Sequence, residues 1–262
     1  MIRSPLAALL LAVPLSAIAV ASTPPQYAVV DLGVQEAGEG LPWQALLATP
    51  TPPSYPTLGG SAYIYASNTL ADVGYSASSS SGAHAVRWVT VNGKTTITDL
   101  GVLPNAYEPN DPAVSFAFGL NLLGDIVGSS DTGYTVNSPA SMQTAPHGFW
   151  WRNGVMTDLG TIAGNNYMSG AEGIDDSEEI VGWTNTISSV NGEVLNRAFV
   201  YIGGTMYNLT FYLVGGPTVL LSDATAIDCQ GNISAVGVPA AGGSTHTYLL
   251  VRQGAARTNC PQ

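Results

Sequence analysis

Three histidines stand at matching positions of a repeated sequence pattern, and they are the first candidates for catalytic chemistry. His84, His147 and His246 each begin a run of alternating small and aromatic or aliphatic residues, and Arg197 begins a fourth such run. A catalytic general base is needed once, at one place. A side chain that recurs in every unit therefore favours a structural role, such as donating to a backbone carbonyl where a strand begins.

Aspartate and asparagine side chains recur in two further series. Asp31, Asp99, Asp158 and Asn208 precede Leu-Gly or its equivalent, and Asn68, Asn121, Asp175 and Asp228 stand at the ends of predicted strands. Such side chains accept hydrogen bonds from backbone N–H groups and stabilise turns. The alternative is that four symmetry-related oxygens line a central channel and hold a hard cation such as Ca²⁺. The sequence predicts no other metal site and no cofactor.

Carboxylates are most concentrated at Asp175, Asp176, Glu178 and Glu179. We expect a solvated turn at this cluster. The alternative is a glycosidase pair, in which carboxylates from different repeats face one cleft. The sequence contains no G-x-S-x-G, H-E-x-x-H, P-loop or EF-hand motif, so it assigns no catalytic residue.

Loop aromatics are the candidate binding residues. Loops carry function when repeated elements form the scaffold, and aromatic rings stack on sugars or anchor protein partners. Five such rings are candidates for contact with a ligand: Trp43, Tyr55, Tyr107, Tyr134 and Tyr167.

The elements that position these side chains form four repeats. The segment HGFWWRNGVMTDLG (147–160) has counterparts beginning at 84, 197 and 246, and its Asn-Gly after alternating residues is a strong hairpin signal. A second hairpin series includes GLNLLGDIVG and GIDDSEEIVG, and its Asx and glycine positions advance by 53 to 55 residues per step. Such a period indicates a propeller or solenoid. We predict repeats of about 54 residues at about 62–101, 115–160, 169–210 and 222–259.

Four short strands per repeat predict an all-β fold, a four-bladed β-propeller that occupies residues 22–262 as a single domain. Residues 27–33, YAVVDLG, match the last strand of a repeat but stand at the beginning of this domain. We expect them to complete the fourth blade and to close the ring, because closure removes exposed strand edges.

These motifs resemble the bacterial extracellular HAF-repeat family, whose units read approximately HAF-x-W-x-NG-x-x-x-DLG followed by G-I-N-x-x-G-x-I-V-G. The matching segments are HGFWWRNGVMTDLG with GIDDSEEIVG, HAVRW with TDLG, GLNLLGDIVG and RAFVY. The match extends over nearly the whole chain after residue 21 and fades in the fourth repeat, which has no Asp-Leu-Gly. The resemblance implies secretion and a propeller-like β fold, and it carries over no general activity.

The composition agrees with export. Residues 1–21 have the early charge, apolar run and small-x-small ending of a secretory signal peptide. Cys229 and Cys260 are the only cysteines, and we expect them to pair in an oxidising compartment. The net charge of −11 repels phosphate backbones and anionic lipid, so we predict neither nucleic-acid binding nor adsorption to membranes. No segment after residue 21 approaches 18 uninterrupted apolar residues, so we predict no membrane insertion.

The sequence thus favours a binding or structural module over an enzyme. We expect a protein of the extracellular space or periplasm that presents variable loops to a carbohydrate or protein partner. The alternative is an extracellular glycoside hydrolase that uses loop carboxylates from different blades.

Overall fold

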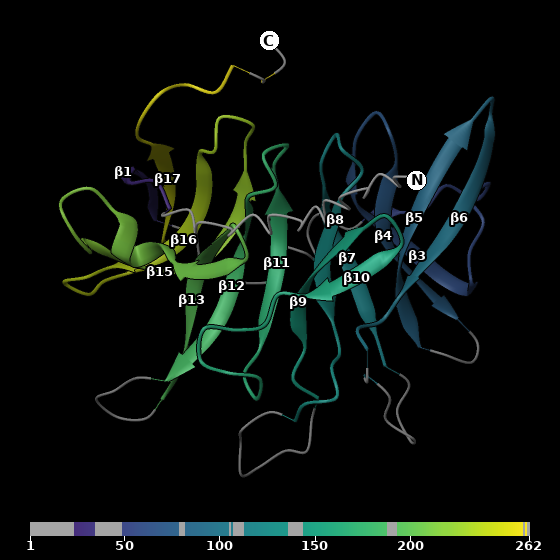
Figure 1. Ribbon diagram of the computed structural model, residues 1–262, viewed down its shortest axis with the longest axis horizontal. Helices are drawn as coiled ribbons and strands as arrows, with labels where there is room; N and C mark the ends of the chain where they lie inside the picture. The colour runs from purple at the N-terminus through teal and green to yellow at the C-terminus, as the bar shows by residue number, and fades with distance from the viewer. Residues whose placement is uncertain are drawn as a thin grey trace, which may run out of the picture.

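The computed structural model contains four antiparallel β-sheets (Figure 1). It describes residues 24–34, 49–78, 82–104, 106, 113–135, 144–187, 193–258 and 260. The predicted signal peptide and the candidate residues Trp43 and Tyr107 lie outside these ranges. The described elements are strands, apart from the short 3-10 helix η1 (Leu209–Tyr212), so the all-β prediction is confirmed.

Each predicted repeat forms one sheet, and its strands follow one another across that sheet. The first sheet contains β2 (Thr49–Pro50), β3 (Gly59–Ser67), β4 (Asp72–Ser78), β5 (Ala83–Val91) and β6 (Lys94–Gly101). The second contains β7 (Ser115–Leu120), β8 (Ile126–Ser130), β9 (His147–Arg152) and β10 (Val155–Asp158). The third contains β11 (Ser169–Ile174), β12 (Ile180–Ile187), β13 (Val194–Ile202) and β14 (Thr205–Asn208). The fourth contains β15 (Val219–Ile227), β16 (Ile233–Pro239), β17 (His246–Arg252) and β1 (Tyr27–Val34).

The N-terminal strand β1 completes the fourth sheet, as its sequence predicted. It pairs antiparallel with β17, from Tyr27 opposite Arg252 to Val34 opposite His246. The chain after β17 forms no further strand among its described residues. The last strand position of the fourth repeat is therefore filled from the other end of the chain.

The hairpin turns between the last two strands have the backbone that Asn-Gly predicts. Asn92 and Gly93 have φ values of 51° and 75°, and Asn153 and Gly154 have 51° and 85°. Both central residues of a type I′ turn need positive φ, which asparagine and glycine tolerate. Because the connections differ in length, the histidine or arginine positions of the third strands, at 84, 147, 197 and 246, are spaced less evenly than the glycines of the second strands.

The recurring glycine of each second strand is required by a close backbone approach. A Cβ added at Gly128 would lie 1.9 Å from the Phe116 carbonyl oxygen of the neighbouring strand β7. This strand bulges between Ala117 and Gly119 and brings its backbone against β8. The equivalent glycines of the other sheets, Gly74, Gly182 and Gly237, meet the first strand in the same way, at 1.9, 2.0 and 2.5 Å.

Successive sheets pack face to face, so that one face of a sheet contacts the preceding repeat and the other face contacts the following repeat. We call the face toward the preceding repeat the leading face and the other the trailing face. The leading face of the second sheet, with Ala117, Ile126 and Phe149, packs on the trailing face of the first, with Val73 and Leu100. The same arrangement joins the second sheet to the third and the third to the fourth.

Serine hydroxyls add a polar tie between the sheets. Ser115, at the start of β7, accepts a hydrogen bond from the Ala85 N–H at 2.8 Å and donates to the Gly101 carbonyl at 2.6 Å, both in the first sheet. Ser169 makes the equivalent pair of bonds to Gly148 and Gly160 of the second sheet. Each hydroxyl thus fixes a new sheet against the third and fourth strands of the sheet before it.

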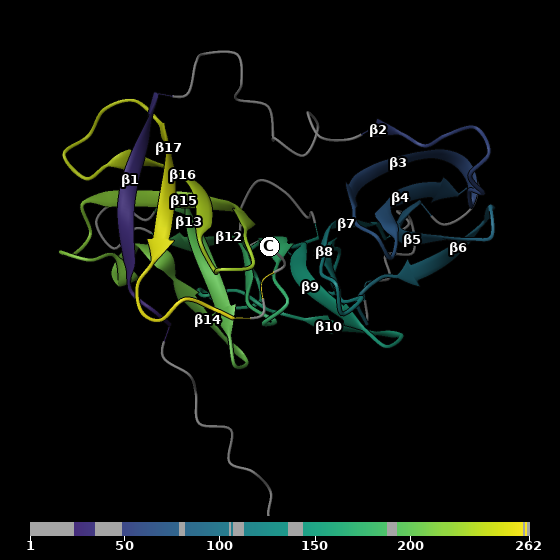
Figure 2. The ribbon, with the colours of Figure 1, turned by 90° about the horizontal axis from the view of Figure 1, so that it is seen from above.

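The first and fourth sheets lie at opposite ends of the molecule (Figures 1 and 2). No hydrophobic cluster of the described residues joins them. The expected ring closure between these two sheets is therefore not found in the described packing. The leading face of the first sheet is instead occupied by Tyr55 and Leu58, which pack on Val86 and Trp88.

Candidate functional site

The recurring histidines form hydrogen bonds with the recurring aspartates. His147 Nδ1 lies 2.9 Å from both carboxylate oxygens of Asp158. The pairs His84–Asp99 and His246–Asp31 repeat this contact at 3.0 and 2.8 Å. The structural interpretation of the histidines is thus supported. A carboxylate of the last strand accepts the Nδ1 hydrogen, and in His147 the Nε2 atom also lies 3.1 Å from a backbone carbonyl, that of Asn165, which is the kind of partner expected.

The aspartate of each pair also caps the turn that follows it. Asp158 Oδ1 accepts the Gly160 N–H at 2.7 Å, and Asp31 Oδ1 accepts the Gly33 N–H at 2.9 Å. The Gly33 N–H and, to a smaller extent, His246 hold the pKa of the Asp31 carboxyl below its usual range. In the third repeat Asn208 makes the same cap to Thr210, and its third strand carries Arg197 where the others carry histidine.

The second Asx series caps the turns between first and second strands. Asn121 Nδ2 donates to the Asp175 carbonyl of the next repeat at 3.0 Å, and Asn68 Nδ2 donates to the Asn121 carbonyl at 2.9 Å. Together Asn68, Asn121 and Asp175 line a depression of about 150 Å³. Their Oδ1 atoms, like that of Asp228, accept N–H groups of their own turns: Leu70 and Ala71, Leu123 and Asp125, Ser177 and Glu179, and Asn232.

These capping bonds favour the turn interpretation over the cation site. The side-chain oxygens that a Ca²⁺ ion would need already accept backbone hydrogens. Within the part of the chain that the structure describes, no group of three or more His, Cys, Asp or Glu side chains could hold a metal ion.

The acidic cluster at 175–179 is not the solvated turn that the sequence suggested. Asp175 and Glu179 are buried, and Arg257 forms an ion pair with each of them. Arg252 binds Glu179 at 2.7 Å. Burial raises the pKa of the Asp175 carboxyl, although Arg257 acts in the opposite direction. The error arose because these arginines come from the fourth repeat and the C-terminal tail, far away in sequence.

The other members of the acidic cluster are also engaged. Asp176 Oδ1 accepts the Leu122 N–H of the second sheet at 2.7 Å. Glu178 pairs with Arg152, which also makes a two-pronged contact with Asp125. These bonds join the turns of neighbouring repeats, which gives the cluster a structural role.

The predicted disulfide is present. Cys229 lies in the turn between β15 and β16, and Cys260 lies in the C-terminal tail, with their Cα atoms 5.5 Å apart. The bond holds the tail over the fourth repeat, where Arg257 reaches the acidic residues of the third.

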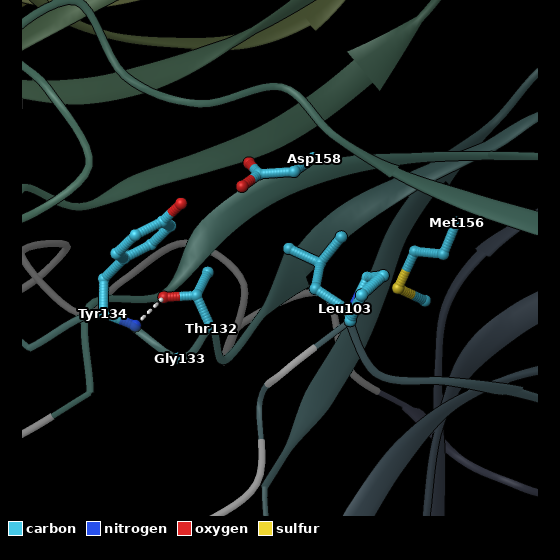
Figure 3. A pocket seen from close by; sticks show the side chains of 7 residues that line it. Leu103, Thr132, Gly133, Tyr134, Met156 and Asp158 are labelled. Atoms are coloured by element: carbon cyan, nitrogen blue, oxygen red, sulfur yellow. Dashed lines mark hydrogen bonds between the residues drawn. The ribbon is translucent and has the colours of Figure 1, made fainter.

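A pocket of about 330 Å³ lies beside the last strand of the second sheet (Figure 3). Three segments line it, namely the chain after β6, the chain after β8 and strand β10: Leu103, Pro104, Thr132, Gly133, Tyr134, Met156 and Asp158. The Tyr134 hydroxyl and the Asp158 carboxylate lie on one side, and Leu103 and Met156 lie on the other (Figure 3). The pocket therefore combines an aromatic ring, a carboxylate and an apolar wall.

The His147–Asp158 pair positions the polar side of this pocket. The Tyr134 ring stacks on the His147 ring with centroids 5.6 Å apart and an interplanar angle of 25°. His147 is fully buried, and its Nε2 lies 3.1 Å from the Asn165 carbonyl. The Tyr134 N–H donates to Thr132 Oγ1 at 3.0 Å. Tyr134 remains 40% exposed, and its ring is fixed by the stacking on His147.

The structure places the predicted loop aromatics in different environments. Tyr134 lines the pocket and is brought together with Asp158. Tyr55 donates its hydroxyl hydrogen to Asp72 at 2.7 Å and packs on Trp88, so it belongs to the end of the first sheet. Tyr167 is buried, which contradicts its prediction as an accessible binding residue. Tyr55 is thus only partly buried, whereas Tyr167 is buried.

The sequence did not single out Leu103, Thr132, Met156 or Asp158 as pocket residues. One signal for the site was present, because the connection between the second and third strands is unusually long in the second repeat, residues 131–146. That extra length provides Thr132 and Tyr134 beside Asp158, whose equivalents Asp99 and Asp31 contact a histidine and cap a turn.

Comparisons of the chain with protein-family models, curated proteins and solved structures give no match. In the described residues, no helix is long and apolar enough to cross a membrane.

Proposed function

We propose that the protein is a secreted binding module that holds one sugar ring of an extracellular carbohydrate in the Tyr134–Asp158 pocket. The observation that supports this most strongly is the partly exposed Tyr134 ring, fixed beside a carboxylate in a pocket of about 330 Å³. Such a volume is at the small end of ligand pockets, which suits one ring rather than a protein side-chain cluster.

The chemistry of the pocket matches both kinds of surface on a sugar. The C–H face of a pyranose packs on an aromatic ring such as Tyr134, and its hydroxyls donate to a carboxylate such as Asp158. Asp158 is suited to this role because His147 and the Gly160 N–H hold its orientation. Binding therefore needs little rearrangement, which favours affinity.

The pocket supports binding better than hydrolysis. Glycosidases need two carboxyl groups that flank the scissile bond. Of the described residues that line the pocket, Asp158 is the sole carboxylate. Two members of the acidic cluster, Asp176 and Glu179, are held by a backbone N–H and by arginines.

We also propose that the four sheets are blades of a propeller-type array and that the chain is a HAF-repeat protein. Four antiparallel strands in each sheet, with sheets packed face to face in sequence order, support the blade assignment. The Cys229–Cys260 bond supports export to an oxidising compartment, either extracellular or periplasmic.

A glycan array followed by calorimetry with the sugars that bind tests the proposal. We expect Asp158→Asn to weaken binding about tenfold or more, because the amide presents only one acceptor oxygen. The matched control is Asp99→Asn. Asp99 makes the equivalent contact with a histidine in the first sheet, but it does not line the pocket. Tyr134→Ala should abolish retention.

Two outcomes would oppose the proposal. Equal losses with Asp158→Asn and Asp99→Asn would mean that the effect is structural. Binding that survives Tyr134→Ala would place the sugar elsewhere. A parallel assay with chromogenic glycosides should show retention without turnover, and turnover would favour the hydrolase.

A further inference from the structure

The junction between the third and fourth sheets differs from the two junctions before it in its polar contacts. In the first and second repeats the histidine of the third strand contacts the aspartate of the last strand. In the third repeat these positions hold Arg197 and Asn208. A permanent cation and a neutral amide therefore replace a histidine and a carboxylate.

The serine tie between neighbouring sheets is also absent at this junction. Ser222 stands at the position of the tying serines of the second and third sheets, but its hydroxyl donates to the Val236 carbonyl of its own sheet at 3.2 Å. The third sheet instead supplies the Thr210 hydroxyl, which accepts the Leu221 N–H at 3.1 Å. The Ser222 hydroxyl thus bonds within the fourth sheet rather than to the third.

A pocket of about 280 Å³ lies at this junction. Its lining comes from the beginning of β13 in the third sheet and from β15 and β16 in the fourth: Leu195, Asn196, Arg197, Leu220, Ser222 and Val238. Three of these side chains are aliphatic, and none of these lining residues is a carboxylate. The pocket therefore surrounds one guanidinium group with largely apolar walls.

The Arg197 guanidinium forms no ion pair within the part of the chain that the structure describes. Arg152, Arg252 and Arg257, by contrast, each contact a carboxylate. Arg197 Nη1 donates to the Asn196 carbonyl at 2.9 Å, which leaves the edge formed by Nε–H and Nη2–H for another acceptor. Because arginine binds a carboxylate through two parallel N–H bonds, this edge suits a carboxylate of a ligand.

We propose that this pocket binds a small aliphatic carboxylate. The carboxylate pairs with Arg197, and the hydrocarbon body packs against the leucine and valine side chains of the two sheets, where burial of apolar surface adds to the affinity. The volume is close to the lower limit of ligand pockets, about 300 Å³, so the ligand is small.

The net charge of the chain does not oppose this contact. The chain carries −11, but charges more than about 8 Å apart in solvent are largely screened at physiological salt. Binding depends on direct contact with Arg197 and with the apolar walls. In the Tyr134–Asp158 pocket, by contrast, the protein supplies the carboxylate. The two pockets therefore take ligands of different chemistry.

NMR titration with isovalerate tests the proposal. The methyl signals of Leu195 and Val238 and the Nε–H signal of Arg197 should shift together, with a dissociation constant on the order of 1 mM for a ligand of about seven non-hydrogen atoms. Isoamyl alcohol and isoamylamine, which have the same hydrocarbon body without the carboxylate, should bind at least tenfold more weakly. Glucuronate should also bind more weakly, because its hydroxyls face apolar walls.

Two variants test whether Arg197 holds the carboxylate. Arg197→Gln removes the charge and should weaken isovalerate binding at least tenfold. The double variant Arg197→His with Asn208→Asp rebuilds the histidine–aspartate contact of the other repeats, and it should lose binding while it keeps its melting temperature. The matched control is Arg87→Gln, which removes an arginine of the first sheet that does not line the pocket and should bind isovalerate like the wild type.

Three results would overturn the proposal: isovalerate binding that survives both Arg197 variants, alcohol binding as tight as that of isovalerate, or glucuronate binding that is tighter. Asp158→Asn should leave isovalerate binding unchanged, because Asp158 lines the other pocket. Failure of this site can therefore be distinguished from failure of the sugar pocket.

Discussion

The first and fourth sheets, at the two ends of the array, differ in whether other residues cover their outer faces. At the first sheet, Tyr55 and Leu58 cover Val86 and Trp88, and the Trp88 Nε1–H donates to the Pro56 carbonyl at 2.8 Å. At the fourth sheet, Leu32 and Val30 remain exposed. Repeat proteins need a finished surface at each end. Loop residues of the same chain thus cover the outer face of the first sheet, which we call the finished end. The outer face of the fourth sheet, which we call the open end, keeps exposed the kind of apolar side chain that the other sheets bury against their neighbours.

The largest effect should come from removing the centre of the finished end. Trp88 is 1% exposed, so Trp88→Ala should lower the free energy of unfolding by about 3–5 kcal/mol. Chemical denaturation measures this loss. Val91→Ala, at an exposed position on the same strand, should change little, and a loss below about 1 kcal/mol at Trp88 would mean that the cover is not packed.

Substitution of two equivalent leucines compares how much an internal interface between sheets and the exposed outer face of the fourth sheet contribute to stability. Leu209→Ala should cost about 2–5 kcal/mol of unfolding free energy, and Leu32→Ala should cost less than about 0.5 kcal/mol. The reason is that Leu209 is fully buried and Leu32 is largely exposed. Denaturation at a concentration where the chain is monomeric provides the measurement. Equal losses would show that a segment of the same chain covers Leu32.

The disulfide in the fourth repeat should also contribute to the stability of the protein. Replacing Cys229 and Cys260 by serine should lower the free energy of unfolding by about 2–4 kcal/mol, because the unfolded chain loses a constraint. The oxidised wild type is compared with the double variant by thermal and chemical denaturation. Reduced wild type is the control and should behave like the variant. A double variant as stable as the oxidised protein would contradict the expected role of the tail.

The smallest effect concerns the pairing of β1 with β17 at low pH. The pKa of Asp31 is held below its usual range, so its contribution to stability is complete above the unfolded-state value of about 3.9 and is lost as the pH falls through the folded value. NMR titration of the Asp31 carboxyl carbon measures the pKa.

His246→Ala provides the control for this titration. It should raise the pKa of Asp31 only in part, because the Gly33 N–H is the larger cause of the shift. An unshifted pKa in the wild type, or full restoration of the usual value by His246→Ala, would contradict this account.

Sequence reasoning located the strands, the disulfide and one of the pocket residues. Tyr134 was among the candidate aromatics, and the pairing of β1 with β17 followed from the match of YAVVDLG to the last strands. It failed for Tyr167 and for the acidic cluster. The contacts of Asp175 and Glu179 with Arg252 and Arg257 join segments that are far apart in sequence.

The sequence by itself determined the repeated hairpins, because strand alternation, Asn-Gly turns and the close approach at Gly128 are local requirements that recur along the chain. Only the tertiary structure decided how the sheets meet. The exposure of Leu32, the cover over Trp88 and the joining of Tyr134 to Asp158 depend on which faces pack together. A sheet face has the same apolar pattern whether its partner is the next repeat, a loop or a second chain.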